Sequence, residues 1–167
     1  MSSRAVKARY LDASAIVKIY ADEDGSSRVR ELFYSAVSFC STSLCIMEAL
    51  GILKGKWLSR NQITEDEYFD KTKKLIISTW GNTIEVDDIN LFTPEGQRST
   101  EAVAKKHSLD LSDALQLQTI LQGRYSRLSG KSSSILITAD EGLAKAARAE
   151  GIRVWDCLRE DMPQWVL

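Results

Sequence analysis

The sequence predicts an α/β fold with three layers, in which helices cover both faces of a mostly parallel five-stranded sheet. Two observations predict it. Short apolar segments of strand length alternate along the chain with longer segments whose apolar residues recur at helical spacing. Parallel neighbours also need a crossover of about a dozen residues, which a helix supplies. At 167 residues the chain suffices for one core but not for two ordinary domains, so we expect a single domain over residues 1–167.

Five apolar segments are predicted to be strands, because each is bounded by turn-forming or helix-capping residues. In chain order they cover residues 6–11, 37–41, 83–86, 134–138 and 152–155. The carboxyl ends of parallel strands share one edge of a sheet, and ligands bind beyond that edge where the strand order reverses. Side chains that follow the strands therefore define the candidate site.

The first two helices are predicted on either side of a break at Gly25. The segment after Asp12 places its apolar residues on one face of a short helix, and residues 29–36 do the same over two turns. Ser26 or Ser27 can cap this second helix.

The next two helices are long and have recognisable starts. Ser43 is expected to cap a helix that keeps regular apolar spacing as far as Trp57. Thr64 and Glu67 form a capping box ahead of a helix that reaches Trp80.

Three more helices are predicted in the second half of the chain. Thr93 and Pro94 supply the N-cap and the first helical residue of one of them. Residues 111–122 and 141–150 follow with helical spacing. Between them, residues 123–133 are polar and basic, which indicates a mobile surface loop.

Composition excludes several classes of protein. No apolar run reaches the ~20 residues of a membrane-spanning helix. Residues 1–10 carry positive charge but lack the apolar stretch of a secretory signal, so we expect a cytoplasmic protein without membrane contact. Cys40, Cys45 and Cys157 have no metal-binding or redox spacing and are expected to be buried free thiols.

The formal net charge of −1 gives no overall attraction for nucleic acid, so such binding would depend on local groups of Lys and Arg. Four groups are candidates, although each is more often a solvated helix face. They are Lys54, Lys56 and Arg60; Lys71, Lys73 and Lys74; Lys105 and Lys106; and Arg124, Arg127 and Lys131. His107, the only histidine, is expected at the surface. The tryptophans are expected in the core or at an interface, namely Trp57, Trp80, Trp155 and Trp165.

Four acidic residues stand where a predicted strand gives way to a helix, or just inside a helix. They are Asp12, Glu48, Asp113 and Asp140. One edge of a parallel sheet can collect all four. Oxygen ligands alone suit Mg²⁺ or Mn²⁺, whereas zinc prefers His and Cys. The sequence therefore predicts a carboxylate metal site in which these residues are both the metal ligands and the catalytic groups.

Each of these acids also has a structural explanation. Asp12 and Asp140 can cap helices, and Asp113 can favour the positive end of a helix dipole. Glu48 differs, because it lies on a helix whose other faces are apolar, where an unpaired charge is costly.

Three further polar residues stand close to the acids in the sequence. Ser14 and Thr138 can orient a carboxylate or a bound water, or can be a plain turn and strand-end hydroxyl. Asp110 lies three residues before Asp113 and can share a helix face with it, as an auxiliary acid.

In the order and spacing of these phrases, the sequence resembles the PIN-domain ribonucleases, and among them the VapC-type toxins of toxin–antitoxin pairs. The phrase L-D-A-S-A at 11–15 matches the acid that closes the family's first strand, and Glu48 matches the acid in the helix after the second. L-S-D-A-L-Q-L carries the third acid, and L-I-T-A-D-E-G-L-A-K-A-A the fourth. Four acids in the family's order favour the metal site over four separate caps. The segments at 80–99 and 123–133 make the chain longer than the compact toxins.

The resemblance implies a metal-dependent endoribonuclease that cleaves RNA through a metal-activated water and leaves a 5′-phosphate and a 3′-hydroxyl. It also implies a cognate antitoxin as partner and a homodimer, for which the helices at 29–33 or 69–80 offer apolar residues. Two alternatives stay open. One is a PIN-like module that binds RNA or protein without cutting. The other is a phosphatase of the haloacid-dehalogenase type, which needs a second Asp where this chain has Ser14.

Overall fold

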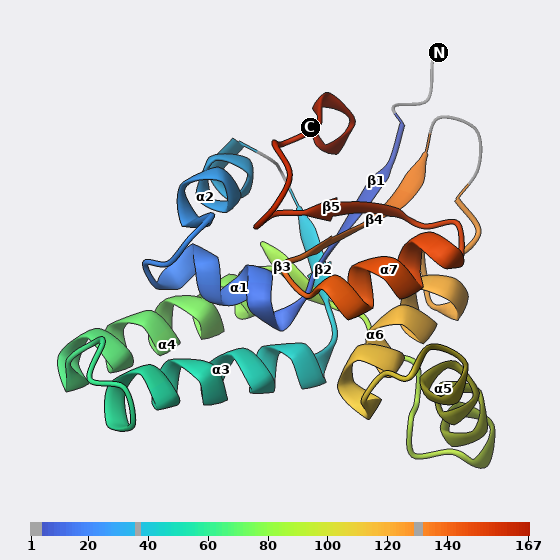
Figure 1. Ribbon diagram of the computed structural model, residues 1–167, viewed down its shortest axis with the longest axis horizontal. Helices are drawn as coiled ribbons and strands as arrows, with labels where there is room; N and C mark the ends of the chain where they lie inside the picture. Colours follow the sequence, from blue (N-terminus) through green and yellow to red (C-terminus); the bar gives the residue numbers. More distant parts are fainter. Residues whose placement is uncertain (1–4, 36–37, 129–131) are drawn as a thin grey trace.

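The computed structural model describes residues 5–35, 38–128 and 132–167, and in these ranges the chain forms one sheet with helices on both faces (Figure 1). The strands are β1 (Lys7–Leu11), β2 (Phe39–Ser41), β3 (Ile84–Val86), β4 (Ser133–Thr138) and β5 (Arg153–Asp156). Their order is β3-β2-β1-β4-β5, and every pair of neighbours is parallel. The predicted three-layer α/β fold is confirmed, and the sheet is wholly parallel rather than mostly so.

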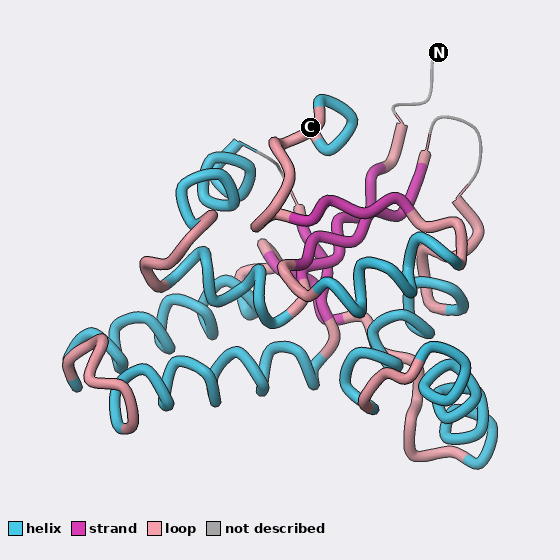
Figure 2. The backbone as a smooth tube through the Cα atoms, viewed as in Figure 1, coloured by secondary structure: helices cyan, strands magenta, loops and turns pink. Residues whose placement is uncertain are grey.

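Helices connect the strands, as Figure 2 shows. They are α1 (Ala13–Tyr20), α2 (Ser26–Ser35), α3 (Ser43–Leu58), α4 (Glu65–Trp80), α5 (Pro94–His107), α6 (Leu111–Gln122), α7 (Glu141–Ala149) and the short 3₁₀ turn η1 (Gln164–Val166). Within the described residues, no helix is long and apolar enough to cross a membrane.

Successive side chains of a strand point to opposite faces of the sheet. Helices cover both faces, so the side chains on both are buried. Leu11, Ile137 and Trp155 belong to the core under α1–α4. Tyr10 and Leu136 belong to the core under α6 and α7. Helix α5 packs outside α6, so it lies one layer further from the sheet (Figure 1).

The predicted N-terminal caps of two helices, α4 and α5, are confirmed. Thr64 and Glu67 form the predicted capping box at α4. Thr93 accepts a hydrogen bond from the Gly96 backbone N–H, and Pro94 is the first residue of α5.

At two other helices the predicted cap is wrong. Thr42, not Ser43, caps α3, because Thr42 keeps an extended backbone while Ser43 is already helical. Ser26 is the first residue of α2. Its hydroxyl donates to the Ala21 carbonyl and accepts from the Glu23 N–H, instead of accepting from an N–H of the first turn of α2. The backbone position of each hydroxyl residue decides which one becomes the N-cap, and the sequence does not give that position.

Two predictions fall partly on residues that the structure does not describe. Val37 of the second strand lies outside the described residues, and β2 begins at Phe39. Ser129, Gly130 and Lys131 of the predicted loop also lie outside them. The free, buried state predicted for all three cysteines is confirmed.

The helix faces proposed for a homodimer differ in exposure. On α2, Val29, Leu32 and Phe33 are buried in the protein's own core, so the prediction that they are exposed is wrong. On α4, by contrast, Phe69 is exposed and Trp80 is 84% exposed. Between the two sets of residues, those at 69–80 on α4 are the exposed ones.

Candidate active site at the carboxyl edge of the sheet

The strand order reverses between β1 and β4, and the candidate acids gather beyond the carboxyl ends of these strands. Asp12 follows β1 directly, and its backbone N–H donates to the Ile137 carbonyl of β4 at 3.0 Å. This contact puts Asp12 beside Thr138, the last residue of β4. Asp12 and Thr138 therefore meet at the point where α/β sheets hold their ligands.

Asp12 is 4% exposed, and both of its carboxylate oxygens accept hydrogen bonds. Its Oδ1 accepts from the Ala13 N–H at 2.6 Å. Its Oδ2 accepts from the hydroxyls of Ser14 at 2.6 Å and Thr138 at 2.8 Å. Burial raises the pKa of Asp12, and these hydrogen bonds oppose that rise. Asp12 thus caps α1, which is the structural role that the sequence offered for it, and its carboxylate lies at the carboxyl edge of the sheet.

The two hydroxyls tie three elements together. Ser14 Oγ accepts from the Ala139 N–H, and Thr138 Oγ1 accepts from the Asp140 N–H, both at 2.9 Å. Each hydroxyl thus receives a backbone proton from the start of α7 and donates its own proton to Asp12. The orientation of the Asp12 carboxylate is fixed by this network.

Asp140 caps α7, and it is exposed to solvent. Its Oδ1 accepts from the Leu143 N–H at 2.7 Å. A cap uses one carboxylate oxygen and leaves the other available for a ligand, so the structural role does not exclude a functional one.

Glu48 lies in the second turn of α3 and faces solvent. The Ser112 hydroxyl donates to its Oε2 at 3.0 Å. Partial burial raises the pKa of Glu48, the Ser112 hydrogen bond lowers it, and the charges of Asp12, Asp110 and Asp140 raise it further. The cost expected of an unpaired charge on an apolar helix does not arise at Glu48, because this residue is exposed, pairs with Ser112 of α6 and lies on a face of α3 that is outside the core.

Asp113 stands in the first turn of α6, and its backbone N–H donates to Asp110 Oδ1 at 2.9 Å. Asp110 therefore caps α6. The Asp113 carboxylate accepts no hydrogen bond from the described residues. Burial raises its pKa to about 8, and the charges of four nearby acids contribute to this rise. In order of their effect, these acids are Asp12, Asp110, Asp140 and Glu48.

The fold thus brings all four predicted acids, with Asp110, into one field of negative charge. The donor set consists of oxygen atoms, which is the kind that Mg²⁺ and Mn²⁺ prefer. A divalent cation would also relieve the repulsion that raises the pKa of Asp113. The side chains do not form a finished coordination sphere: among residues 5–35, 38–128 and 132–167, no three His, Cys, Asp or Glu side chains group as metal ligands. The site fits a hard cation in chemistry, and binding one requires these side chains to turn toward it.

Several residues near the acids were missed by sequence reasoning. Ser112 precedes Asp113 directly, and its bond to Glu48 depends on how α3 and α6 pack. Arg159 donates to the Ala139 carbonyl at 3.2 Å and so places a cation at the rim of the site. Arg159 also pairs with Asp156, three residues before it, at 2.9 Å and with Glu141 of α7 at 3.8 Å.

A buried amide lies under the site. Gln116 follows Asp113 by three residues, so it is on the same side of α6, and it is fully buried. Its Oε1 accepts from the Cys45 thiol, whose Sγ lies 3.9 Å from Asp12 Oδ1. Its Nε2 has no hydrogen-bond partner among the described residues.

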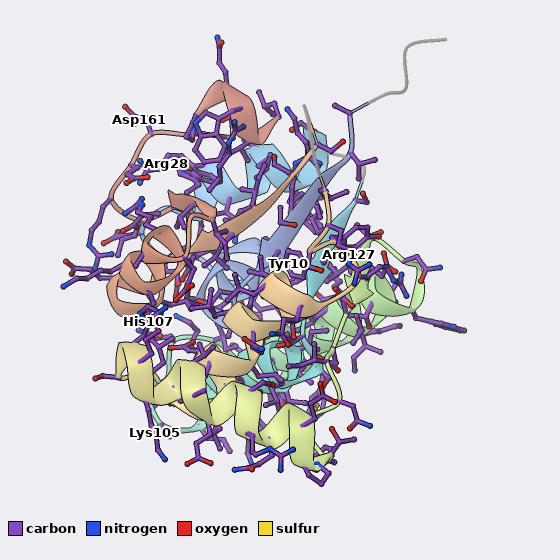
Figure 3. The ribbon with its side chains drawn as sticks, turned by 90° about the vertical axis from the view of Figure 1, so that its right-hand side faces the viewer. Tyr10, Arg28, Lys105, His107, Arg127 and Asp161 are labelled. Atoms are coloured by element: carbon purple, nitrogen blue, oxygen red, sulfur yellow. The ribbon has the colours of Figure 1, made fainter. Side chains whose placement is uncertain are left out.

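Two predictions about charged surface residues need correction. Lys56 is 5% exposed and forms an ion pair with Glu23 at 2.8 Å, so it is not free to contact a phosphate. His107 is half-buried between α5 and α7, with its Nε2 2.6 Å from Glu150 Oε1 (Figure 3). Lys106 also pairs with Glu150. Each of these side chains contacts a carboxylate that is distant in the sequence.

Comparison with known proteins adds two findings. The family model described as "PIN domain" matches residues 9–149 of the chain. The crystal structure of PAE2754 from Pyrobaculum aerophilum is similar, with a TM-score of 0.59 and 18% sequence identity over 90% of this chain and 92% of that chain. At this identity the likeness concerns the fold alone. No match was found among curated proteins.

Proposed function

Because the chain belongs to the PIN domain family, whose members are typically nucleases, we propose that it is a metal-dependent endoribonuclease. The observation that carries the proposal is the gathering of Asp12, Glu48, Asp113 and Asp140 at the point where the strand order reverses. PIN domains generally use divalent ions, and these carboxylates would hold Mg²⁺ or Mn²⁺. When bound, such an ion activates a water and neutralises charge on the scissile phosphate.

The protein's own residues would have distinct roles in this reaction. Asp12 is held in one orientation by Ser14 and Thr138, so it offers a fixed ligand. Asp113 accepts no hydrogen bond from the described residues, so it can turn toward an ion. Arg159 lies at the rim but pairs with Asp156 and Glu141, so a phosphate would have to compete with these carboxylates for its charge. Single-stranded or looped RNA is the proposed substrate, because its backbone can approach a site at a sheet edge.

Cleavage of a labelled single-stranded RNA by purified protein in Mn²⁺ tests the proposal. The wild type should yield products with a 5′-phosphate and a 3′-hydroxyl. Asp113→Asn should lose at least about a hundredfold in rate, as expected when a group that acts on the reacting atoms is lost. Asp24→Asn, at an exposed acid in the turn before α2, is the matched control and should cleave normally. Equal cleavage by wild type and Asp113→Asn would reject the site.

The assignment to a VapC-type toxin is a further part of the proposal, and it rests on the order of the acid phrases. A cognate antitoxin should be encoded beside this protein, and its co-expression should suppress cleavage. A homodimer is proposed on the same basis. Of the earlier alternatives, a PIN module without catalytic activity stays in competition, and RNA binding without cleavage in the assay above would favour it.

A further inference from the structure

A cavity of ≈ 300 Å³ lies beside the acids at the carboxyl edge of the sheet. Its walls come from the start of α3, from the segment at 88–92 that follows β3, and from α6. Most of its lining is apolar, and Leu44, Ile89 and Leu115 contribute to it. None of the residue roles in the proposed nuclease reaction involves this cavity.

The cavity adjoins the candidate active site through two helices. Leu44 lies one helical turn before Glu48 on α3, and Leu115 lies one turn after Ser112 on α6. Ser112 donates to Glu48 at 3.0 Å. The Glu48–Ser112 contact therefore lies one helical turn from two residues of the cavity wall.

The segment at 88–92 presents an aromatic ring and polar groups at the cavity. Phe92 is 95% exposed, which is unusual for a ring of this size. Asn90 Oδ1 accepts from the Phe92 N–H at 3.1 Å, and Asp88 Oδ1 accepts from the Ser43 N–H at 2.8 Å. These bonds hold the segment in place. The Asn90 amide Nδ2 and the second Asp88 oxygen have no hydrogen-bond partner within the described residues.

We propose that this cavity binds one unpaired nucleobase of the RNA strand, next to the phosphate that is cut; the proposal rests on the nuclease function above. A volume near 300 Å³ is at the lower limit for small-molecule sites and suits a single ring system rather than a peptide helix. Phe92 offers a face for stacking. Asp88 would repel a phosphate but can accept from a base N–H, and Asn90 can donate to a base acceptor. The site would therefore favour cleavage beside an accessible base.

Binding of short single-stranded RNAs tests the proposal. Each RNA carries an abasic ribose at a different position, and affinity is measured by fluorescence anisotropy without divalent ions, so that nothing is cut. For the wild type, one abasic position should weaken binding by roughly tenfold, the effect of losing one base stacked on an aromatic ring. Phe92→Ala should bind intact RNA about as weakly as the wild type binds the RNA with that abasic position. In this variant the same abasic position should weaken binding little further, since both changes remove the same contact. Phe92 is almost fully exposed, so its replacement leaves the core intact.

Tyr34→Ala is the matched control. Tyr34 is 76% exposed and lies in the last turn of α2, at the amino edge of the sheet. This variant should keep the abasic pattern of the wild type. Equal effects at all abasic positions, an unchanged pattern in Phe92→Ala, or no RNA binding at all would overturn the proposal. A position-specific effect without cleavage in Mn²⁺ would instead support the cavity and reject the nuclease function.

Discussion

Replacing Asp113 with Asn should stabilise the protein in the absence of metal, and the effect should depend on pH. Burial and the neighbouring acids raise the pKa of Asp113 to about 8, from an ordinary value of 3.8. Between these two values the folded protein keeps a proton that the unfolded chain releases. The stability of the wild type should therefore fall as pH rises from about 4 to about 8. Below about pH 4, Asp113 is protonated in both states and does not change the stability.

The size of this effect follows from the change in pKa. If fully expressed, a rise from 3.8 to about 8 corresponds to roughly 6 kcal/mol above the higher pKa. Asp113 is only partly buried, and solvent screening reduces this figure to about 2 kcal/mol. Its carboxylate accepts no hydrogen bond from the described residues, so Asn loses none there. Asp113→Asn should therefore exceed the wild type in stability by about 2 kcal/mol at pH 8 and by little at pH 5.

Urea unfolding in EDTA at pH 5 and pH 8 measures the difference. Asp24→Asn is the control for the loss of one negative charge, and it should follow the wild type at both pH values. If wild type and Asp113→Asn lose the same stability between pH 5 and pH 8, the acids do not act on Asp113 as the structure indicates, and the argument for a strained carboxylate site fails.

Three further predictions concern other parts of the molecule. Asp12→Asn should destabilise the metal-free protein by about 1–3 kcal/mol, because an amide has only one accepting oxygen: when that oxygen accepts from Ser14 and Thr138, the NH₂ group faces the Ala13 N–H, which donates to Oδ1 in the wild type; charge repulsion alone would predict the opposite, so a raised melting temperature contradicts it. Millimolar Mn²⁺ should raise the melting temperature of the wild type and have a weaker effect on Asp113→Asn, and equal responses in calorimetry would exclude Asp113 as a ligand. The protein should be a homodimer by light scattering, and Trp80→Glu should shift it toward monomer; a monomeric wild type at micromolar concentration would refute this.

The sequence by itself determined which elements form and some of the residues that end them. Strand and helix spacing, the capping box at Thr64, and the acids Asp12 and Asp140 after β1 and β4 are signals between neighbours in the chain. Such signals act over a few residues, through periodic burial and backbone hydrogen bonds, so a single sequence reveals them. The parallel topology gave the expectation that one edge could collect the four acids, and the family resemblance favoured a metal site over separate caps.

The tertiary structure alone decided which side chains meet. The order β3-β2-β1-β4-β5 puts Thr138 beside Asp12, although 126 positions separate them. The packing of α3 on α6 creates the Glu48–Ser112 bond and the cavity beside it, and that of α5 against α7 lets His107 reach Glu150. These contacts depend on which apolar faces pack together across the whole chain, and local patterns carry no information about that choice. For the same physical reason most of the rise in the pKa of Asp113 is not visible in its neighbouring residues: Asp110 is close in the sequence, but burial and the charges of Asp12, Asp140 and Glu48 come from the packing of other elements.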